Sequence, residues 1–170
     1  MKTLILLAAT LALLRTAPAA AQATPSPNTP EYIKVPTGYL VVLRQGASVL
    51  ERLKALAQQE QLPSASFSAI GFVDITFGFF NFKTKQYTPR TFKNVELASM
   101  NGSIAWQGNE VSIHAHGVAT DETFRASGGH ILEAIVSTGS VEILVTVHDK
   151  LLQRHIENPP GANVLQLGAD

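Results

Sequence analysis

The sequence predicts an α+β fold, either a mostly antiparallel sheet or an open barrel, with one main amphipathic helix. Three observations lead to this prediction. About seven β-rich runs are separated by short turn signals such as Gly108-Asn109. One stretch alone combines a helix start signal with an apolar stripe at helical spacing. The length of 170 residues, without an internal repeat, fits a single domain.

The helix is expected directly after the turn Gln45-Gly46-Ala47. Ser48 and Glu51, three residues apart, form a capping box that marks its first turn. Proline disfavours helix at the residue before it, so Pro63 ends the helix at Leu62. Its apolar stripe consists of Val49, Leu50, Leu53, Leu56 and Ala57.

The strands are predicted from β-rich runs bounded by turn residues. The run 66–82 is apolar on both alternating faces, so we expect it to be covered on both sides. Its phenylalanines are interpreted as core and subunit interface rather than as a ligand-stacking surface: Phe72, Phe77, Phe79, Phe80 and Phe82. The expected strands are 39–43, 66–82, a short one around Tyr87, 95–104, 110–118, 130–136, 141–147 and an edge strand at 164–167.

The N-terminus has the three-part layout of a secretory signal peptide over residues 1–23. A cationic head, Met1-Lys2-Thr3, precedes the apolar run Leu4–Leu14, and Ala21-Gln22-Ala23 supplies the cleavage site. The run is too short to span a bilayer, which needs about 20 residues. We therefore expect an exported protein, periplasmic or secreted, with no membrane span in its mature form.

Residues 24–37 are rich in proline, threonine and serine, and predict an extended linker before a domain over 38–170. Without Lys2 and Arg15 the chain carries 11 basic against 13 acidic residues. This balance gives few contacts to phosphates, so nucleic acid is not an expected partner. The absence of cysteine excludes disulfides and a lipid anchor, and leaves core burial and subunit association as sources of stability.

Three of the five histidines lie in two neighbouring segments. His114 and His116 are two residues apart in a predicted strand, so both rings point to one face. His130 begins the next apolar run after Gly128-Gly129, and joins them if the two runs pair. Three imidazoles are a common zinc ligand set that leaves one position open for water. His148 and His155 lie outside this cluster and are expected at the surface.

Each of these features has an alternative interpretation. The three histidines can be structural residues that bond to backbone or water. Gly128-Gly129 is interpreted as a tight turn with positive φ, with close approach to an anion as the alternative. Glu96 and Asp121 are candidate supporting residues of the histidine site or general bases, and Asp121 can equally belong to a solvated loop.

Several motifs together resemble the plants-and-prokaryotes-conserved (PPC) domain in its prokaryotic form, over roughly residues 38–151. They are a strand and an amphipathic helix, Ser68-Ala69-Ile70-Gly71, the stretch Glu96–Ile104, His114-Ala115-His116, a loop with Asp121, and Gly128-Gly129-His130. The resemblance implies a compact α+β domain that forms a homotrimer. It also implies a metal such as zinc, or another divalent transition ion, at His114, His116 and His130.

Two function classes remain open at this point. The first is an exported metal-binding protein with a three-histidine site, also open to a small-molecule ligand, in which catalysis is undecided. The second is a trimeric binding or interaction module of the PPC family, which is known for DNA binding, with structural histidines. Plant members carry a separate AT-hook for DNA, and this chain has no Arg-Gly-Arg-Pro motif.

Overall fold

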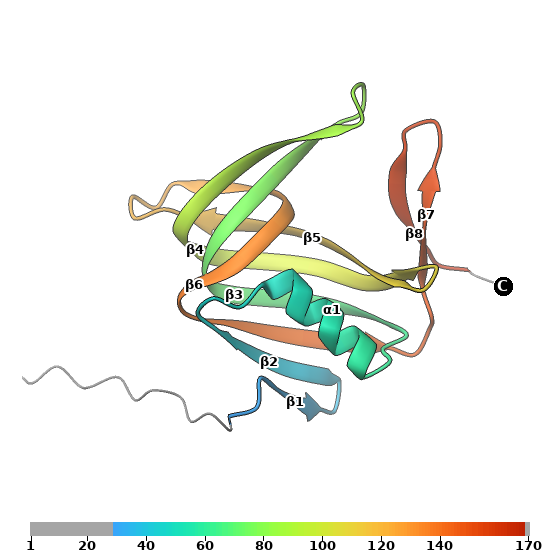
Figure 1. The fold of residues 1–170 in the computed structure, drawn as a ribbon, viewed down its shortest axis with the longest axis horizontal. Coiled ribbons are helices and arrows are strands. Elements are labelled where there is room, and N and C mark those ends of the chain that lie inside the picture. The colour runs from blue at the N-terminus through green and yellow to red at the C-terminus, as the bar shows by residue number, and fades with distance from the viewer. Residues whose placement is uncertain (1–28, 169–170) are drawn as a thin grey trace, which may run out of the picture.

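A computed structural model of the chain describes residues 29–168 (Figure 1). The predicted signal peptide, residues 1–23, lies outside the described residues. Between residues 29 and 168, no helix combines the length and apolar character that a membrane crossing requires.

The described chain contains eight strands and one helix. Their bounds are β1 (Tyr32–Val35), β2 (Gly38–Arg44), α1 (Val49–Gln59), β3 (Ser64–Asn81), β4 (Gln86–Gln107), β5 (Glu110–Thr120), β6 (Ala126–His148), β7 (Gln153–Glu157) and β8 (Ala162–Gln166).

The strands form one sheet with the order β1-β2-β6-β3-β4-β7-β8. Strand β5 pairs with both β4 and β6, so the sheet closes on itself over part of its length and is not a regular barrel. All pairs are antiparallel except a single parallel contact between β4 and β7, at Trp106 and Gln153. The predicted α+β class is therefore confirmed, and the open barrel holds only in this partial sense.

Several predicted short strands are parts of longer ones. Strand β6 runs through Thr138-Gly139-Ser140, which we predicted as a turn between two strands. Opposite this segment, Gly71 of β3 pairs with Val141 and Val73 pairs with Val136. The intervening residues form a bulge, so the turn-forming sequence bends the strand without reversing the chain. Likewise, the strand around Tyr87 and the strand 95–104 are both parts of β4.

The predicted linker is shorter than residues 24–37, because β1 lies inside it. Tyr32 pairs with Val41 in the antiparallel contact between β1 and β2. The rings of Tyr32 and Tyr39 lie edge to face at 5.7 Å, and both hydroxyls donate to the Glu60 carboxylate, at 2.7 and 2.8 Å. We did not predict this strand, because the surrounding sequence is rich in proline. Contacts between the two tyrosines and Glu60, at the end of α1, hold it in place.

The core lies between α1 and one face of the sheet (Figure 1). The predicted cap is present, since Ser48 Oγ accepts a hydrogen bond from the Glu51 backbone N–H at 3.5 Å. The buried helix residues match the predicted stripe apart from Leu50, which is half-buried: Val49, Leu53, Leu56 and Ala57.

We predicted that the strand over residues 66–82 is covered on both sides, but only one face of β3 is covered in the described chain. Phe67 and Ala69 face the core, whereas Ile70 and Phe72 are exposed on the outer face of the described chain. The phenylalanine group divides in the same way. Phe77 is buried, but Phe79 and Phe82 are exposed. A strand at one face of a helix-covered sheet alternates between core and surface even where its sequence is apolar throughout.

Candidate metal centre

The three histidines predicted as ligands lie together on neighbouring strands. His116 of β5 is directly opposite His130 of β6, and His114 is two residues along β5. Adjacent Ala115 is buried in the core, so both β5 histidines face outward. The three ring centroids are 5.1 to 5.2 Å apart. We call these three residues the histidine floor.

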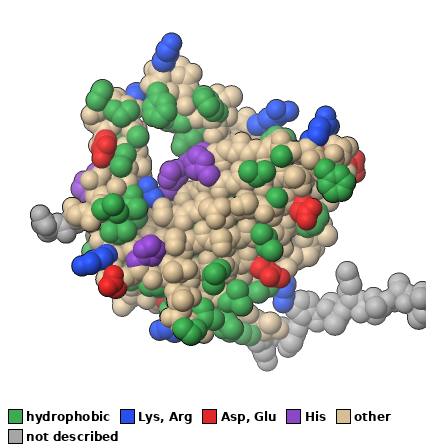
Figure 2. All heavy atoms as spheres, turned by 180° about the vertical axis from the view of Figure 1, so that it is seen from behind, with side chains coloured by type: hydrophobic (Ala, Val, Ile, Leu, Met, Phe, Trp, Pro, Cys, Tyr) green, Lys and Arg blue, Asp and Glu red, His purple; other side chains and the backbone are tan. Residues whose placement is uncertain are grey.

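The histidine floor lies on the side of the molecule turned away from α1. Figure 2, viewed from behind Figure 1, shows a group of histidines beside a hollow with hydrophobic side chains around it. This hollow corresponds to a cavity of about 500 Å³. His114 and His116 are exposed, whereas His130 is half-buried.

Aromatic residues from the paired ends of β3 and β4 form one side of this cavity. Tyr87 stacks on His130 with a centroid distance of 4.9 Å and an interplanar angle of 24°. Phe80 packs against both Tyr87 and Phe82, at 5.0 and 4.9 Å. We call Phe79, Phe80, Phe82 and Tyr87 the aromatic wall, since all four line the cavity. The ligand-stacking alternative for the phenylalanines thus fits Phe79, Phe80 and Phe82 better than a core role does.

A missing side chain makes room for the stacked ring. Gly78 is directly opposite His130 across the β3–β6 contact. A Cβ at this position would lie 2.8 Å from Tyr87 Cδ1 and 2.7 Å from Leu132 Cδ1, closer than carbon atoms pack. Glycine at 78 therefore allows Tyr87 to lie against His130.

The hairpin of β7 and β8 forms the opposite side of the cavity. Its residue Arg154 is buried, and its guanidinium donates to Ser103 Oγ at 2.5 Å and to the Asn163 carbonyl at 3.4 Å. Ser103 is opposite His114 in the β4–β5 pairing, so this arginine lies close to the histidine floor. Arg154 also lines the cavity itself.

The surroundings of the histidine floor favour neutral imidazoles. Burial, followed by the charges of His114 and His116, lowers the pKa of His130 to about 4. Burial is also the main reason that the pKa of His114 is lowered, with the Arg154 charge as the next cause. Metal binding requires deprotonated ring nitrogens, so these shifts prepare both residues for an ion at neutral pH.

The histidine floor fits a transition-metal ion. One ring nitrogen from each histidine can be chosen so that all three lie within 4.8 Å of one another. Nitrogens bound to one tetrahedral zinc ion lie about 3.4 Å apart, so ring movements on the order of 1 Å would complete the site. Zinc, copper, nickel and iron all accept imidazole, so the donor set does not select one of them.

Two other candidate residues do not belong to this site. Glu96 is exposed and lines a separate hollow with Ile70 and Glu142. Asp121 caps its own loop, where its Oδ1 accepts hydrogen bonds from the backbone N–H groups of Thr123 and Arg125. Neither carboxylate is part of the histidine cluster. Asp121 is therefore close to the histidines in sequence, but its carboxylate is not part of their site.

Gly128-Gly129 is not the predicted tight turn, because both residues lie inside β6. Gly128 is opposite Val118 on β5, and a Cβ on it would lie 2.5 Å from the Gly117 carbonyl oxygen. Gly129 does have the positive φ, +155°, that we predicted. The pair lets β5 and β6 approach closely beside His130.

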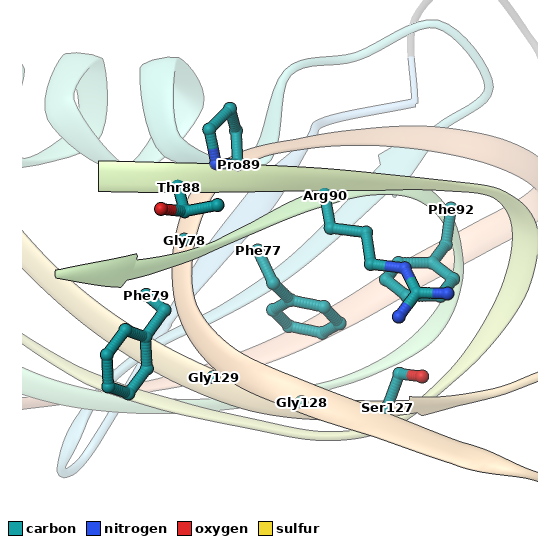
Figure 3. Close-up of a pocket in the computed structure, with 10 residues that line it drawn as sticks. All are labelled: Phe77, Gly78, Phe79, Thr88, Pro89, Arg90, Phe92, Ser127, Gly128 and Gly129. Carbon is teal, nitrogen blue, oxygen red and sulfur yellow. The ribbon is translucent and has the colours of Figure 1, made fainter. Parts of the chain in front are cut away.

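Both glycines also line a second cavity of about 490 Å³ that adjoins the first (Figure 3). It shares Gly78, Phe79 and Gly129 with the histidine cavity. Arg90 lies over the ring of Phe92 there, with its guanidinium carbon 5.2 Å from the ring centroid.

Two residues of the site were missed by sequence reasoning. The sequence around Tyr87 predicted a strand and no functional role. Arg154 lies in a segment that contains no recognisable motif. His148 and His155 are exposed and outside the cluster, as predicted.

The comparisons with known proteins agree with this fold. The family described as the Plants and Prokaryotes Conserved (PCC) domain, written PPC above, matches residues 31–149. The chain belongs to this family. No curated protein matches it significantly. The three histidines all lie within the matched part of this PPC-domain chain, whereas β7 and β8 lie beyond it.

Solved structures of the same fold include proteins from bacteria and an archaeon. A candidate DNA-binding protein from Ralstonia eutropha JMP134 is 53% identical, with a TM-score of 0.80 over 81% of this chain and 96% of its own. Another so named, from Bacteroides thetaiotaomicron VPI-5482, is 28% identical, with a TM-score of 0.75 over 79% and 95%. A plant- and prokaryote-conserved protein from Pyrococcus horikoshii is 25% identical, with a TM-score of 0.69 over 77% and 92%.

Proposed function

We propose that this PPC-domain protein binds one divalent transition-metal ion per chain through His114, His116 and His130, and that this ion is zinc. The observation that carries the proposal is the convergence of three ring nitrogens within 4.8 Å. The lowered pKa values of His114 and His130 support it, because neutral imidazoles do not repel a cation. Three protein ligands leave a position for water or a small molecule, which the adjoining cavity can accommodate.

Such a site would supply a bound water with a lowered pKa, as catalytic zinc does. The chain's own residues would then orient the ion and limit solvent access. Tyr87 fixes the plane of His130, and the aromatic wall covers one side of the cavity. This arrangement suits binding of a small molecule beside the ion.

We also propose that the protein is exported and assembles as a homotrimer. Export is supported by the head, apolar run and cleavage site in residues 1–23. Association is supported by apolar residues on the outer face of the sheet, where Leu40 and Leu144 are opposite each other and Ile70 is exposed. N-terminal sequencing of the native protein should begin at Thr24, and light scattering should give three times the monomer mass.

A second candidate function is DNA binding, which the names of the Ralstonia and Bacteroides relatives suggest. Without residues 1–23 the chain has more acidic than basic residues, which argues against phosphate contacts. We therefore expect no salt-dependent, submicromolar binding to duplex DNA in a gel-shift assay at physiological ionic strength. Such binding would favour the interaction-module function with structural histidines.

The metal proposal is tested by elemental analysis of untagged protein after incubation with zinc and desalting. Wild type should retain about one zinc per chain, and His114→Ala should lose most of it, since each imidazole is one of three ligands. His148→Ala and His155→Ala are matched controls, because both histidines are exposed and outside the cluster. Negligible zinc in wild type and His114→Ala alike would contradict the proposal.

A further inference from the structure

A buried positive charge adjoins the histidine floor without a protein carboxylate to balance it. Arg154 is only 3% exposed, and its Nε–H has no hydrogen-bond acceptor among the described residues. Its other two contacts are to the neutral oxygens of Ser103 and Asn163. Among residues 29–168, none of the ion pairs involves Arg154. A buried charge of this kind is costly unless a counter-charge accompanies it.

The cavity supplies no such counter-charge. No aspartate or glutamate of the part of the chain that the structure describes lines it. The Arg154 guanidinium donates to Ser103, which is opposite His114 in the β4–β5 pairing, so this charge lies beside the histidine floor. A divalent ion on three neutral imidazoles would make the cavity more positive still. The charge distribution therefore favours an anionic ligand.

The shape and lining of the cavity favour an organic acid over an inorganic anion. A guanidinium presents a planar set of donors that matches a carboxylate, and within the described chain Arg154 is the only lysine or arginine that lines the cavity. The aromatic wall offers apolar surface that phosphate could not use, but a carbon skeleton could. The volume of about 500 Å³ accommodates a small organic molecule.

We propose that this cavity binds a small organic carboxylate, with its carboxylate at Arg154 and its carbon skeleton against the aromatic wall. The inference deepens the proposed metal function and rests on it in part, because a bound ion would attract the same carboxylate. Arg154 and the aromatic wall act without the ion, so the two ideas can fail separately.

The test is an NMR titration of the full protein, metal-free and zinc-loaded, with three probes. Phenylacetate carries both a carboxylate and a ring, phenylacetamide is its neutral analogue, and phosphate is the inorganic anion. We expect phenylacetate to bind at least about tenfold more tightly than phenylacetamide, since a hydrogen bond to a charged group is the main difference. It should also bind more tightly than phosphate, and shift the Arg154 Nε–H resonance.

Variants then assign the effect to one side chain. Arg154→Gln should weaken phenylacetate binding at least about tenfold and leave phenylacetamide binding nearly unchanged. Arg154→Lys keeps the charge but loses the planar donor set, so it should give an intermediate loss. Arg90→Gln is the matched control, because Arg90 lines only the neighbouring cavity. Circular dichroism melting checks that each variant folds. If a variant does not fold, the shift of the Arg154 Nε–H resonance in wild type still tests the proposal.

The outcomes separate the two proposals. If zinc does not bind but metal-free protein prefers phenylacetate through Arg154, the metal proposal fails and the carboxylate site stands. Equal binding of phenylacetate and phenylacetamide, preference for phosphate, or equal affinity in wild type and Arg154→Gln would each overturn the carboxylate site.

Discussion

The histidine floor and the C-terminal hairpin border the same cavity but come from different parts of the chain. His114, His116 and His130 lie within residues 31–149, the stretch that matches the PPC family, and are fixed by the pairing of β5 with β6. Arg154 comes from β7, beyond that stretch, and reaches the cavity by packing against Ser103 of β4. The comparison separates the groups suited to hold an ion from the group that we propose selects an anionic ligand.

The largest expected effect comes from breaking the histidine floor. His116→Ala removes a ligand, so we expect the Kd for zinc to rise by at least about 100-fold, beyond the loss typical of a supporting residue. Arg154→Gln should instead lower the Kd, because it removes a positive charge near the ion. Competition with a chromophoric chelator measures both constants. Similar losses in both variants would remove the distinction between floor and hairpin.

The next effect is the pH dependence of the metal-free protein. The pKa of His130 is about 4 in the fold and near 6.5 in an unfolded chain. Between these values the unfolded chain binds the proton and the folded chain does not, so stability should fall as pH drops from 6.5 towards 4. The carboxyls of Glu60, Asp74 and Asp121 have lowered pKa values, so their contributions are lost only at lower pH.

Thermal melting at pH 7 and pH 5 measures this effect. His130→Gln should lose less stability over that interval than wild type, because it no longer carries the depressed pKa. An identical loss in both proteins would show that His130 is not the group that titrates. We also expect wild type to release zinc only as the pH drops below about 6, where protons begin to compete with the ion for the imidazole nitrogens.

A smaller effect is expected where the aromatic wall meets the histidine floor. Gly78→Ala places a Cβ against Tyr87 and Leu132, so Tyr87 should move away from His130. The NMR shift of the His130 ring should change as the stacked ring departs, and the Kd for zinc should rise by no more than about tenfold. Gly168→Ala is the control, since no atom of the described residues lies within 4 Å of its added Cβ. An unchanged His130 shift would mean that Gly78 does not position Tyr87.

The smallest effect concerns the two carboxylates that the sequence suggested as supporting residues. Glu96 lines a separate hollow, and Asp121 bonds within its own loop. Glu96→Gln and Asp121→Asn should therefore leave the zinc Kd of the folded protein unchanged. The same chelator competition provides the measurement. A clear loss of zinc affinity in either variant would show that this carboxylate does support the metal site.

Local patterns predicted much of this structure. The capping box at Ser48 and the stripe that follows placed α1 to within a few residues. Strand alternation put His114 and His116 on one face, and their ring contact confirms it. His130 joined them because the residues that precede it in β6, from Ala126 onward, pair with β5 and place it opposite His116. These predictions rest on periods of two and 3.6 residues, which neighbouring residues determine.

What the sequence did not predict depends on contacts between distant segments. The turn-like residues around Gly139 form a bulge because β3 continues on the other side of β6. Arg154 reaches the site through a strand contact with β4 and a hydrogen bond to a residue 51 positions earlier. Tyr87 was assigned to a strand, but its position against His130 depends on the missing side chain at Gly78.

The direct opposition of His116 and His130 has a consequence for a chain without cysteine. An ion shared by these two side chains would join β5 to β6 and tie together the ends of the connection 117–129. A disulfide joins strands in a similar way in many exported proteins, where the covalent cross-link reduces the conformational freedom of the unfolded chain. The proposed metal would instead be a removable cross-link of the folded chain, which adds stability because the ion binds the folded state and not the unfolded one, so a chelator would lower the melting temperature as well as empty the site.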